Sequence, residues 1–307
     1  MLSFTYNGRP SRVIFGPGTL SRLPEEVERL DLKRVLVLAT PPQRQDAERL
    51  AASIGDRCAG VFAGAVMHTP VGVTDEALEL VRRDGVDGLV AVGGGSTTGL
   101  AKAIALRTDL PQIVAPTTYA GSEMTPILGE TKDGRKVTQS SPKILPEIVI
   151  YDVDLTLTLP AAMSGTSGMN AIAHAIEALY AKEGNPITEL MALEAIGALY
   201  ESLPVIAREP SDRDARAKAL YGAWLCGICL GSVGMALHHK LCHTLGGMFD
   251  LPHAETHTIV LPQALAYNAP AIPEVMDKLR RRLGTDDPAM ALFDLAGRIG
   301  AKRALRD

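Results

Sequence analysis

The sequence predicts a chain of two parts, an α/β part with a parallel sheet followed by an all-helical part. In the first half, short runs of β-branched and other apolar residues alternate with helical stretches, which is the pattern of a parallel sheet covered by helices. From about residue 156 onward strand patterns cease and long helical patterns continue. A chain of 307 residues is also long for a single core.

The first half contains strand patterns separated by helical stretches. Each strand pattern is a short apolar run, and each helical stretch after it is long enough to pack on the sheet that the strands form. The strand patterns lie at 11–15, 34–39, 59–64, 87–92 and 112–116, and the helical stretches lie near 18–30, 43–54, 74–84 and 96–107.

This alternation ends after Pro116. The stretch PILGETKDGRKVT predicts two short strands joined by a Lys-Asp-Gly-Arg turn, and EIVIYD predicts one more strand. We therefore place the boundary between 155 and 160, with an α/β domain at 1–157 and a helical domain at 158–307. The expected helices of the second domain cover roughly 161–182, 188–207, 212–245, 255–267 and 288–304.

Composition argues against several classes of function. A net charge of −4 and a pI near 6.0 argue against nucleic acid as a partner. The apolar run around Cys226 and Cys229 is too short and too glycine-rich to span a bilayer, and MLSFTYNGRP lacks a signal-peptide pattern. The two cysteines are better explained as small buried side chains than as a redox pair. We expect a cytoplasmic protein without a membrane partner.

A glycine loop follows the strand pattern at 87–92 and opens the next helix. Glycine lets the backbone approach an anion closely, and a helix N-terminus offers free N–H groups to phosphate. The hydroxyls behind the glycines can cap the helix or donate to phosphate. The loop matches no standard nucleotide motif, so alone it is equally well explained as a tight turn. Its position after a central strand favours a nucleotide site at Gly93, Gly94, Gly95, Ser96 and Thr97.

A second hydroxyl-rich loop, PTTYAGSE, follows the next strand pattern. Its residues Thr117, Thr118 and Ser122 would line the same crevice as the glycine loop, because adjacent strand ends lie at one edge of a sheet. Two such loops suit a dinucleotide, whereas a mononucleotide needs only one of them.

Histidines are concentrated between 238 and 257, which hold five of the seven in the chain. His239 and His243 stand four residues apart, so on a helix both rings lie on one face. A glycine pair at 246–247 is expected to stop this helix, and the loop behind it brings His253 back. Any one of these histidines is more often a surface or hydrogen-bonded core residue than a functional one.

A second helical pattern carries Asn170, His174 and Glu177 on one face, at positions i, i+4 and i+7. Polar groups on an otherwise apolar helix need a partner when they are buried. If this face meets the histidine helix, three or four imidazoles converge with one carboxamide. Together the two helices therefore favour a functional site.

The chain carries four motifs in a fixed order: GGGS with Ala101-Lys102-Ala103, PTT-x-x-GSE-x-T, GMNAIAHAIEALYA, and H-x3-H-x9-H ending in LPHAETHTIVLP. In this order the motifs resemble the iron-containing alcohol dehydrogenase superfamily, with its dehydroquinate synthase-like fold. The resemblance implies a nucleotide-binding domain, a helical domain, catalysis in the cleft between them, and a homodimer. Family members usually continue for a further helical segment, so we expect the helical domain to be incomplete at its C-terminal end.

The resemblance assigns the metal-ligand positions of the family to Asn170, His174, His239 and His253. Metal-dependent members have aspartate at the first position, whereas a neutral amide is a weak ligand for a divalent ion. Three imidazoles can still hold zinc. However, GGGSTTGLAKAIALRT and PTTYAGSEMTPILGETKDGRK closely resemble a branch of the family that shares the asparagine and is regarded as metal-independent. We therefore expect no required metal.

That branch uses NADH or NADPH to reduce the carbon–carbon double bond of maleylacetate, a dicarboxylate, to 3-oxoadipate in aromatic compound degradation. Hydride adds at the carbon β to the ketone, and charge accumulates on the ketone oxygen. The resemblance places His243 next to the nicotinamide, where we expect it to be the general acid, with His253 as the second candidate. His174 and His239 would shape the polar pocket, and Asn170 would donate to the substrate.

The cofactor preference and two alternative functions remain open. No carboxylate follows the strand pattern at 34–39, where Thr40 stands, so NADPH should be tolerated alongside NADH. An iron- or zinc-dependent alcohol dehydrogenase of the same superfamily would lose activity on chelation. A non-catalytic nucleotide-binding module with structural histidines would bind cofactor without turnover.

Overall fold

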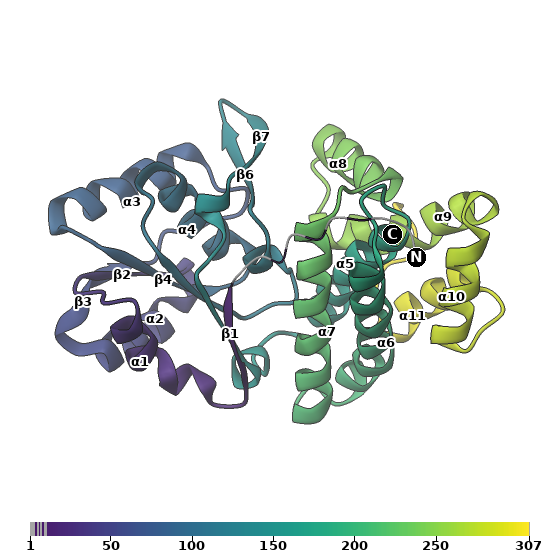
Figure 1. Cartoon of the computed structure of the whole chain (residues 1–307), viewed down its shortest axis with the longest axis horizontal. Coiled ribbons are helices and arrows are strands. Elements are labelled where there is room, and N and C mark those ends of the chain that lie inside the picture. Colours follow the sequence, from purple (N-terminus) through teal and green to yellow (C-terminus); the bar gives the residue numbers. More distant parts are fainter. Residues whose placement is uncertain (1–3, 5, 7, 9–10, 307) are drawn as a thin grey trace. The chain divides into compact units, whose positions relative to one another are not determined.

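The computed structural model describes residues 4, 6, 8 and 11–306 (Figure 1). These residues form two compact units. The α/β unit holds 11–118 and 122–156, and the helical unit holds 119–121 and 157–306 together with the described residues before 9. The chain therefore contributes a short loop piece, Tyr119–Gly121, to the helical unit before it completes the α/β unit.

The α/β unit is organised around a six-stranded sheet with the order β1-β8-β5-β4-β2-β3, in which all neighbours are parallel. Strands β2, β4, β5 and β8 are buried along their whole length, as expected for apolar runs without alternation. The predicted parallel sheet is confirmed. Its strands are β1 (Arg12–Gly16), β2 (Val35–Leu38), β3 (Cys58–Phe62), β4 (Gly88–Gly93), β5 (Gln112–Pro116) and β8 (Ile148–Asp152).

Helices cover both faces of this sheet. In β2, Val35 and Val37 belong to one apolar cluster with residues of α1 and α2, whereas Leu36 and Leu38 belong to a second with α3 and α4. The helices that follow β2 and β4 therefore lie on opposite faces. The carboxyl ends of these two neighbouring strands form the switch point at which open α/β sheets bind ligands. The helices are α1 (Leu23–Arg29), α2 (Arg44–Ile54), α3 (Val71–Asp84) and α4 (Gly95–Thr108).

An antiparallel hairpin, β6 (Ile127–Lys132) and β7 (Arg135–Ser140), lies between β5 and β8 in the sequence. Its two turn residues, Asp133 and Gly134, have positive φ angles of 50° and 73°. Such a pair of φ angles suits the tight turns that match the twist of a hairpin. The two short strands predicted around the Lys-Asp-Gly-Arg turn are confirmed.

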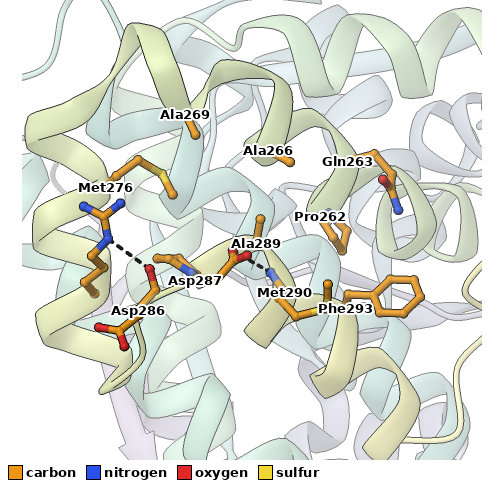
Figure 2. A pocket seen from close by; sticks show the side chains of 12 residues that line it. Pro262, Gln263, Ala266, Ala269, Met276, Asp286, Asp287, Ala289, Met290 and Phe293 are labelled. Atoms are coloured by element: carbon orange, nitrogen blue, oxygen red, sulfur yellow. Dashed lines mark hydrogen bonds between the residues drawn. The ribbon is translucent and has the colours of Figure 1, made fainter.

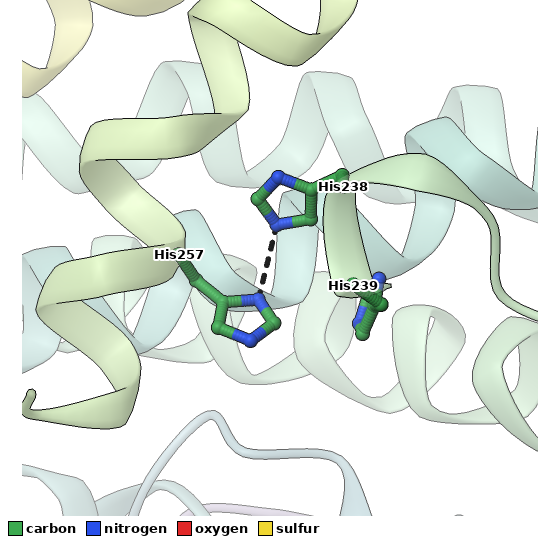
Figure 3. A group of neighbouring side chains, drawn as sticks. All are labelled: His238, His239 and His257. Carbon is green, nitrogen blue, oxygen red and sulfur yellow. Dashed lines mark hydrogen bonds between the residues drawn. The ribbon is translucent and has the colours of Figure 1, made fainter. Parts of the chain in front are cut away.

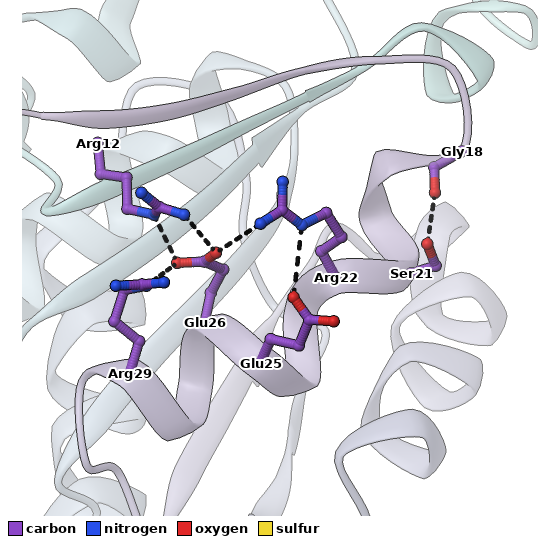
Figure 4. A network of polar contacts seen from close by, with 7 residues as sticks. All are labelled: Arg12, Gly18, Ser21, Arg22, Glu25, Glu26 and Arg29. Carbon is purple, nitrogen blue, oxygen red and sulfur yellow. Dashed lines mark hydrogen bonds and ion pairs between the residues drawn. The ribbon is translucent and has the colours of Figure 1, made fainter.

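A buried carboxylate anchors the first helix to the first strand. Glu26 of α1 accepts hydrogen bonds from the Nε atoms of Arg12 at 2.9 Å and Arg29 at 3.1 Å, and Arg22 lies 3.6 Å away (Figure 4). Burial alone would raise the pKa of this carboxyl, but the guanidinium groups hold it below its ordinary value. The ionised carboxylate therefore joins β1 and α1 through charge-assisted hydrogen bonds.

The helical unit has α5, α6 and α7 as its packed centre, and these helices lie side by side in Figure 1. Helix α6 is apolar and long enough to cross a bilayer, but half of it is buried inside the protein, as in the core helix of a folded domain. The helices are α5 (Ala161–Leu179), α6 (Pro186–Arg208), α7 (Arg213–Ser232), α8 (Leu237–Phe249), α9 (His253–Asn268), α10 (Pro273–Leu283) and α11 (Pro288–Arg298).

Two helix predictions for this unit are wrong, and one helix was missed. The single helix expected at 212–245 is broken after Ser232, and α8 runs at 93° to α7. The glycine pair at 246–247 does not stop α8, which continues to Phe249 and is capped by Asp250, a residue with a left-handed φ of 51°. Glycine lowers helix propensity by only about 1 kcal/mol, which tertiary contacts can override. Helix α10 lies in a stretch for which no helix was predicted, although its apolar residues recur at helical spacing.

Candidate active site

The predicted glycine loop joins β4 to α4 and brings two backbone segments into close contact. A Cβ atom at Gly93, whose φ is 155°, would lie 2.3 Å from Oγ1 of Thr97. A Cβ atom at Gly94 would lie 2.9 Å from Cγ2 of Thr118. Only glycine fits both positions without displacement. Helix α4 begins at Gly95, which is exposed, so the N-terminus of this helix is accessible at the switch point.

The hydroxyl groups behind this loop divide into buried and accessible ones. Thr97 and Thr98 are buried, and the hydroxyl of Thr98 donates back to the carbonyl of Gly94 at 3.3 Å. Ser96 alone of the three is partly exposed. The hydroxyl of Thr97 is buried and has no hydrogen-bond partner among the described residues, and its predicted role at a cofactor stays a prediction. Backbone N–H groups and Ser96 remain for an anion.

A polar chain crosses the carboxyl ends of the strands beside this loop. Thr40, after β2, donates from its hydroxyl to Oε1 of Gln43 at 2.9 Å, and Nε2 of Gln43 donates to Oγ1 of Thr117 at 3.3 Å. Thr117 follows β5, so the chain joins the two strands on either side of β4. Thr40 and Thr117, both predicted to bind cofactor, are thus bridged by Gln43. Gln43 was missed, because nothing in its local sequence marks it as a bridge.

Ser122 belongs to a different contact from the one expected. Its hydroxyl lies 3.3 Å from Nζ of Lys102, and the same ammonium group donates to the carbonyl oxygens of Thr125 at 2.8 Å and Ile127 at 3.0 Å. Lys102 is fully buried, and desolvation lowers its pKa to about 7 despite the nearby carboxyl of Glu123, which raises it. Ser122 thus helps to hold a buried lysine. This role was not predicted, and the one local signal for it is a lysine inside an apolar helix.

Helices α5, α8 and α9 bring together the histidines that the sequence singled out. The ring centroids of His174 and His239 lie 5.0 Å apart, and those of His239 and His243 lie 6.1 Å apart. His253 lies 6.1 Å from His243 and 4.2 Å from His257. The predicted meeting of the two helix faces is confirmed. We call this group, with His238 and Asn170, the histidine cluster.

Glu177 organises the buried side of the histidine cluster. Its carboxylate accepts hydrogen bonds from Nδ1 of His239 at 2.7 Å and from the backbone N–H groups of Ala236 at 2.8 Å and His238 at 2.7 Å. Burial alone would raise the pKa of Glu177, but the bond from His239 and its charge lower it below the ordinary value. One carboxylate therefore fixes both the start of α8 and the ring of His239. The sequence placed Glu177 on the correct face but assigned it no role.

The histidine cluster has an exposed side and a buried side. His243 and His253 are exposed, whereas His174, His239 and His257 are buried. Desolvation lowers the pKa of His174 and His257 well below the ordinary histidine value, and neighbouring histidines add to the effect. His174 and His257 are therefore neutral near pH 7. The exposed rings of the cluster are those of the predicted general acids, His243 and His253.

The sequence analysis missed the central position of His257. Its ring lies within 6.3 Å of the rings of His238, His239, His243 and His253. A signal was present, because His253 and His257 stand four residues apart in HAETH, on one face of α9. The same spacing of four residues predicted that His239 and His243 lie on one helix face.

An iron or zinc ion is the group that the resemblance implies for this cluster. Asn170 Oδ1, His174 Nδ1 and His239 Nε2 are buried and lack a hydrogen-bond partner among the described residues. Atoms of this kind suit a divalent ion. However, the donor set is neutral, and the carboxylate of Glu177 is already engaged by hydrogen bonds. The residues therefore fit a divalent ion, but only weakly, because no ligand offsets its charge.

A second trio of histidines is close enough to share an ion but does not offer its nitrogens freely. His238, His239 and His257 place one nitrogen each within 4.8 Å of one another. Nε2 of His238 already lies 3.0 Å from Nδ1 of His257 (Figure 3). These two nitrogens are therefore engaged with each other.

A separate cavity of about 510 Å³ lies among α9, α10 and α11 of the helical unit (Figure 2). Its lining is mostly apolar, with Arg280, Asp286 and Asp287 at one side. The Nε atom of Arg280 donates to the carbonyl of Asp286 at 3.0 Å. No residue that lines this cavity was predicted to bind cofactor or substrate, and none of them is a histidine.

Comparison with known proteins adds independent evidence. Residues 10–153 match the model of iron-containing alcohol dehydrogenases, and residues 164–307 match that of the C-terminal part of the Fe-containing alcohol dehydrogenase family. A maleylacetate reductase from Rhizobium sp. (strain MTP-10005) is 57% identical over 99% of this chain and 87% of its own length. The crystal structure of maleylacetate reductase from Agrobacterium tumefaciens is 56% identical, with a TM-score of 0.97 over 100% of this chain and 87% of that chain.

An iron-containing alcohol dehydrogenase from Corynebacterium glutamicum ATCC 13032 KITASATO is more distant. It is 43% identical, with a TM-score of 0.96 over 100% of this chain and 86% of that chain. The chain therefore belongs to the iron-containing alcohol dehydrogenase family, whose members are nicotinamide-dependent oxidoreductases. Within this family it falls with the maleylacetate reductases, which match nearly its whole length at 50% to 57% identity.

Proposed function

We propose that this protein reduces the carbon–carbon double bond of maleylacetate to give 3-oxoadipate, with NADH or NADPH as hydride donor and without a required metal. The observation that carries the proposal is the buried, neutral carboxamide of Asn170 in the histidine cluster, at the position where the resemblance implies an acidic ligand. The likeness to maleylacetate reductases at 57% and 56% identity supports the substrate.

The chemistry of the substrate suits the groups in the cluster. Hydride adds to the carbon β to the ketone, the electrons of the double bond move toward the ketone, and an enolate forms. A proton must then reach the carbon α to the ketone. His243 and His253 are exposed imidazoles, so either can deliver this proton as a general acid. Asn170 would donate a hydrogen bond to the ketone oxygen, and His174 and His239 would shape the polar pocket around it.

A metal ion would stabilise the negative charge on the ketone oxygen in a different way. If an ion were held by His174, His239, His253 and Asn170, it would polarise the ketone oxygen as a Lewis acid. The ketone of an enone already delocalises the charge that hydride addition creates. Neutral donors are therefore sufficient in the proposed reaction, and the alternative of a metal-dependent alcohol dehydrogenase is not favoured.

The α/β unit would hold the cofactor at its switch point. The exposed N–H groups at the start of α4 and the hydroxyl of Ser96 suit a pyrophosphate. Thr40 follows β2, where strict NAD enzymes of this fold type have an acidic residue for the ribose. The absence of a carboxylate at Thr40 favours acceptance of NADPH as well as NADH. We also propose a homodimer in the cytoplasm that acts in aromatic compound degradation.

One assay separates these functions. NADH or NADPH oxidation is followed with maleylacetate as substrate, with and without a chelator, and the product is identified. We expect 3-oxoadipate at the same rate in both conditions. Loss of activity on chelation, with recovery after addition of iron or zinc, would indicate a metal-dependent enzyme. Cofactor binding without turnover would indicate a non-catalytic module.

A further inference from the structure

Two buried histidines outside the ligand positions of the family meet inside the histidine cluster. The side chains of His238 and His257 are 1% and 0% exposed. Nε2 of His238 lies 3.0 Å from Nδ1 of His257, as Figure 3 shows. Neither residue is needed for hydride transfer or for protonation as described above. Burying two imidazoles costs free energy unless they are paired, so their pairing calls for an explanation.

His257 is the ring against which the exposed histidines pack. Its centroid lies 4.2 Å from that of His253 and 6.3 Å from that of His243. On its buried side it lies 4.8 Å from His238 and 4.9 Å from His239. A rotation of the His257 ring would therefore alter the contact with His253, the nearer of the two proposed proton donors. Nε2 of His257 has no hydrogen-bond partner among the described residues, so the bond to His238 is the contact that orients the ring.

The bond also couples the protons of the two rings. A hydrogen bond between two imidazoles has one N–H between the two nitrogens, so the accepting nitrogen carries no proton. While the bond persists, the ring that accepts is therefore held in one tautomer.

Cys242 contacts the other side of His238. Its Sγ atom lies 3.9 Å from Nδ1 and 3.7 Å from Nε2 of His238, and the side chain is buried. The ring of His238 is therefore packed between Cys242 and His257.

We propose that His238 and His257 are positioning residues of the reductase site. The hydrogen bond between them fixes the ring orientation of His257, and the fixed ring supports His253 for proton transfer. This inference rests on the proposed reductase function. It assigns a role to two residues that are neither general acids nor ligand positions of the family.

A matched pair of substitutions tests the proposal. His238→Phe keeps a planar ring but removes both nitrogens, whereas His238→Gln keeps an N–H donor near the position of Nε2. We expect His238→Phe to lower kcat for maleylacetate about 10- to 100-fold, the range found when an orienting partner is lost. KM for NADH should stay unchanged, and His238→Gln should recover most of the rate. In ¹⁵N NMR spectra, His257 should show a single tautomer in the wild type and in His238→Gln, and both tautomers in His238→Phe.

The outcomes separate this proposal from a structural role and from the proposed function. Equal kcat in the wild type and His238→Phe would overturn it, as would a wild-type spectrum in which His257 shows both tautomers. A loss of rate in both variants together with a lower melting temperature would show a structural role and would overturn it too. The spectra need no substrate. A wild type that does not reduce maleylacetate would therefore contradict the proposed function, while the spectra still decide whether His238 fixes His257.

Discussion

The glycine loop of the α/β unit and the histidine cluster of the helical unit differ in how far apart their parts lie in the sequence. The loop is built from neighbours at 93–98 and presents backbone N–H groups at the start of α4. The cluster collects side chains between Asn170 and His257 from α5, α8 and α9. A substitution in the loop should therefore act on cofactor binding, whereas one in the cluster should act on turnover, metal affinity or acid stability.

The largest effect is expected from His243→Ala, which removes the exposed imidazole of the cluster. Turnover should fall about 100- to 10,000-fold, the range for loss of a general acid. The dissociation constant of NADH should change little, as measured by fluorescence titration. Thr244→Ala alters the neighbouring exposed residue and serves as the control. Wild-type turnover in His243→Ala would remove this residue from the mechanism.

Glu177→Gln tests whether one carboxylate holds the cluster together. The substitution keeps the size of the side chain but removes the charge that accepts bonds from His239 and two backbone N–H groups. We expect the free energy of unfolding to fall by about 2 kcal/mol, because hydrogen bonds to a buried charge are strong. Glu183 provides a matched control, since it accepts from Gly234 at 3.1 Å but is exposed. An equal loss for Glu183→Gln in chemical denaturation would contradict the assignment.

Gly94→Ala tests the glycine loop of the α/β unit. The added Cβ would lie 2.9 Å from Cγ2 of Thr118, whose side chain can rotate away, so the fold should persist. The methyl group would obstruct the approach of a pyrophosphate, and we expect affinity for NADH to fall about tenfold, or ~1.4 kcal/mol. The value of kcat at saturating NADH should change less. Gly247→Ala, at a position with open space around it, should leave affinity unchanged.

Asn170→Asp restores an acidic side chain in the cluster. The negative charge should raise zinc affinity by about tenfold or more and should weaken binding of the dicarboxylate substrate. Calorimetric titration with zinc measures the first effect, and KM for maleylacetate measures the second. A variant with unchanged zinc affinity and full reductase activity would contradict the charge argument. Asn185→Asp, at the start of α6, changes the charge by the same amount outside the cluster.

The smallest effect concerns acid stability. The folded pKa of His174, His238 and His257 lies below the ordinary value of 6.5, so the unfolded chain binds more protons in acid. Their contribution to stability is therefore complete above about pH 6.5 and is lost as pH falls. Each ring should lower the free energy of unfolding by up to about 1.4 kcal/mol per pH unit in this range. Urea unfolding at several pH values from 7.5 to 5 measures this effect. The free energy of unfolding should fall less steeply with falling pH for His238→Phe than for the wild type.

Local patterns in the sequence were sufficient for the parallel sheet, the hairpin and the glycine loop. The short apolar runs of strands such as Val35–Leu38 and the turn residues Asp133-Gly134 are local features of the sequence, so they can be recognised without the fold. The faces that carry His174 and His239 could be predicted for the same reason. The helix stop expected at 246–247 was wrong because glycine is only a weak local signal.

Other features required the folded chain. Lys102 looks like any helix residue until its ammonium group meets the carbonyls of Thr125 and Ile127. The break between α7 and α8 leaves the backbone N–H groups of Ala236 and His238 free to donate hydrogen bonds to the carboxylate of Glu177. The sequence by itself determined which helices carry imidazoles and that one acidic ligand position is neutral. The tertiary structure alone decided which rings meet, because hydrogen bonds between residues such as His238 and His257 depend on the packing of different helices, which no local pattern encodes.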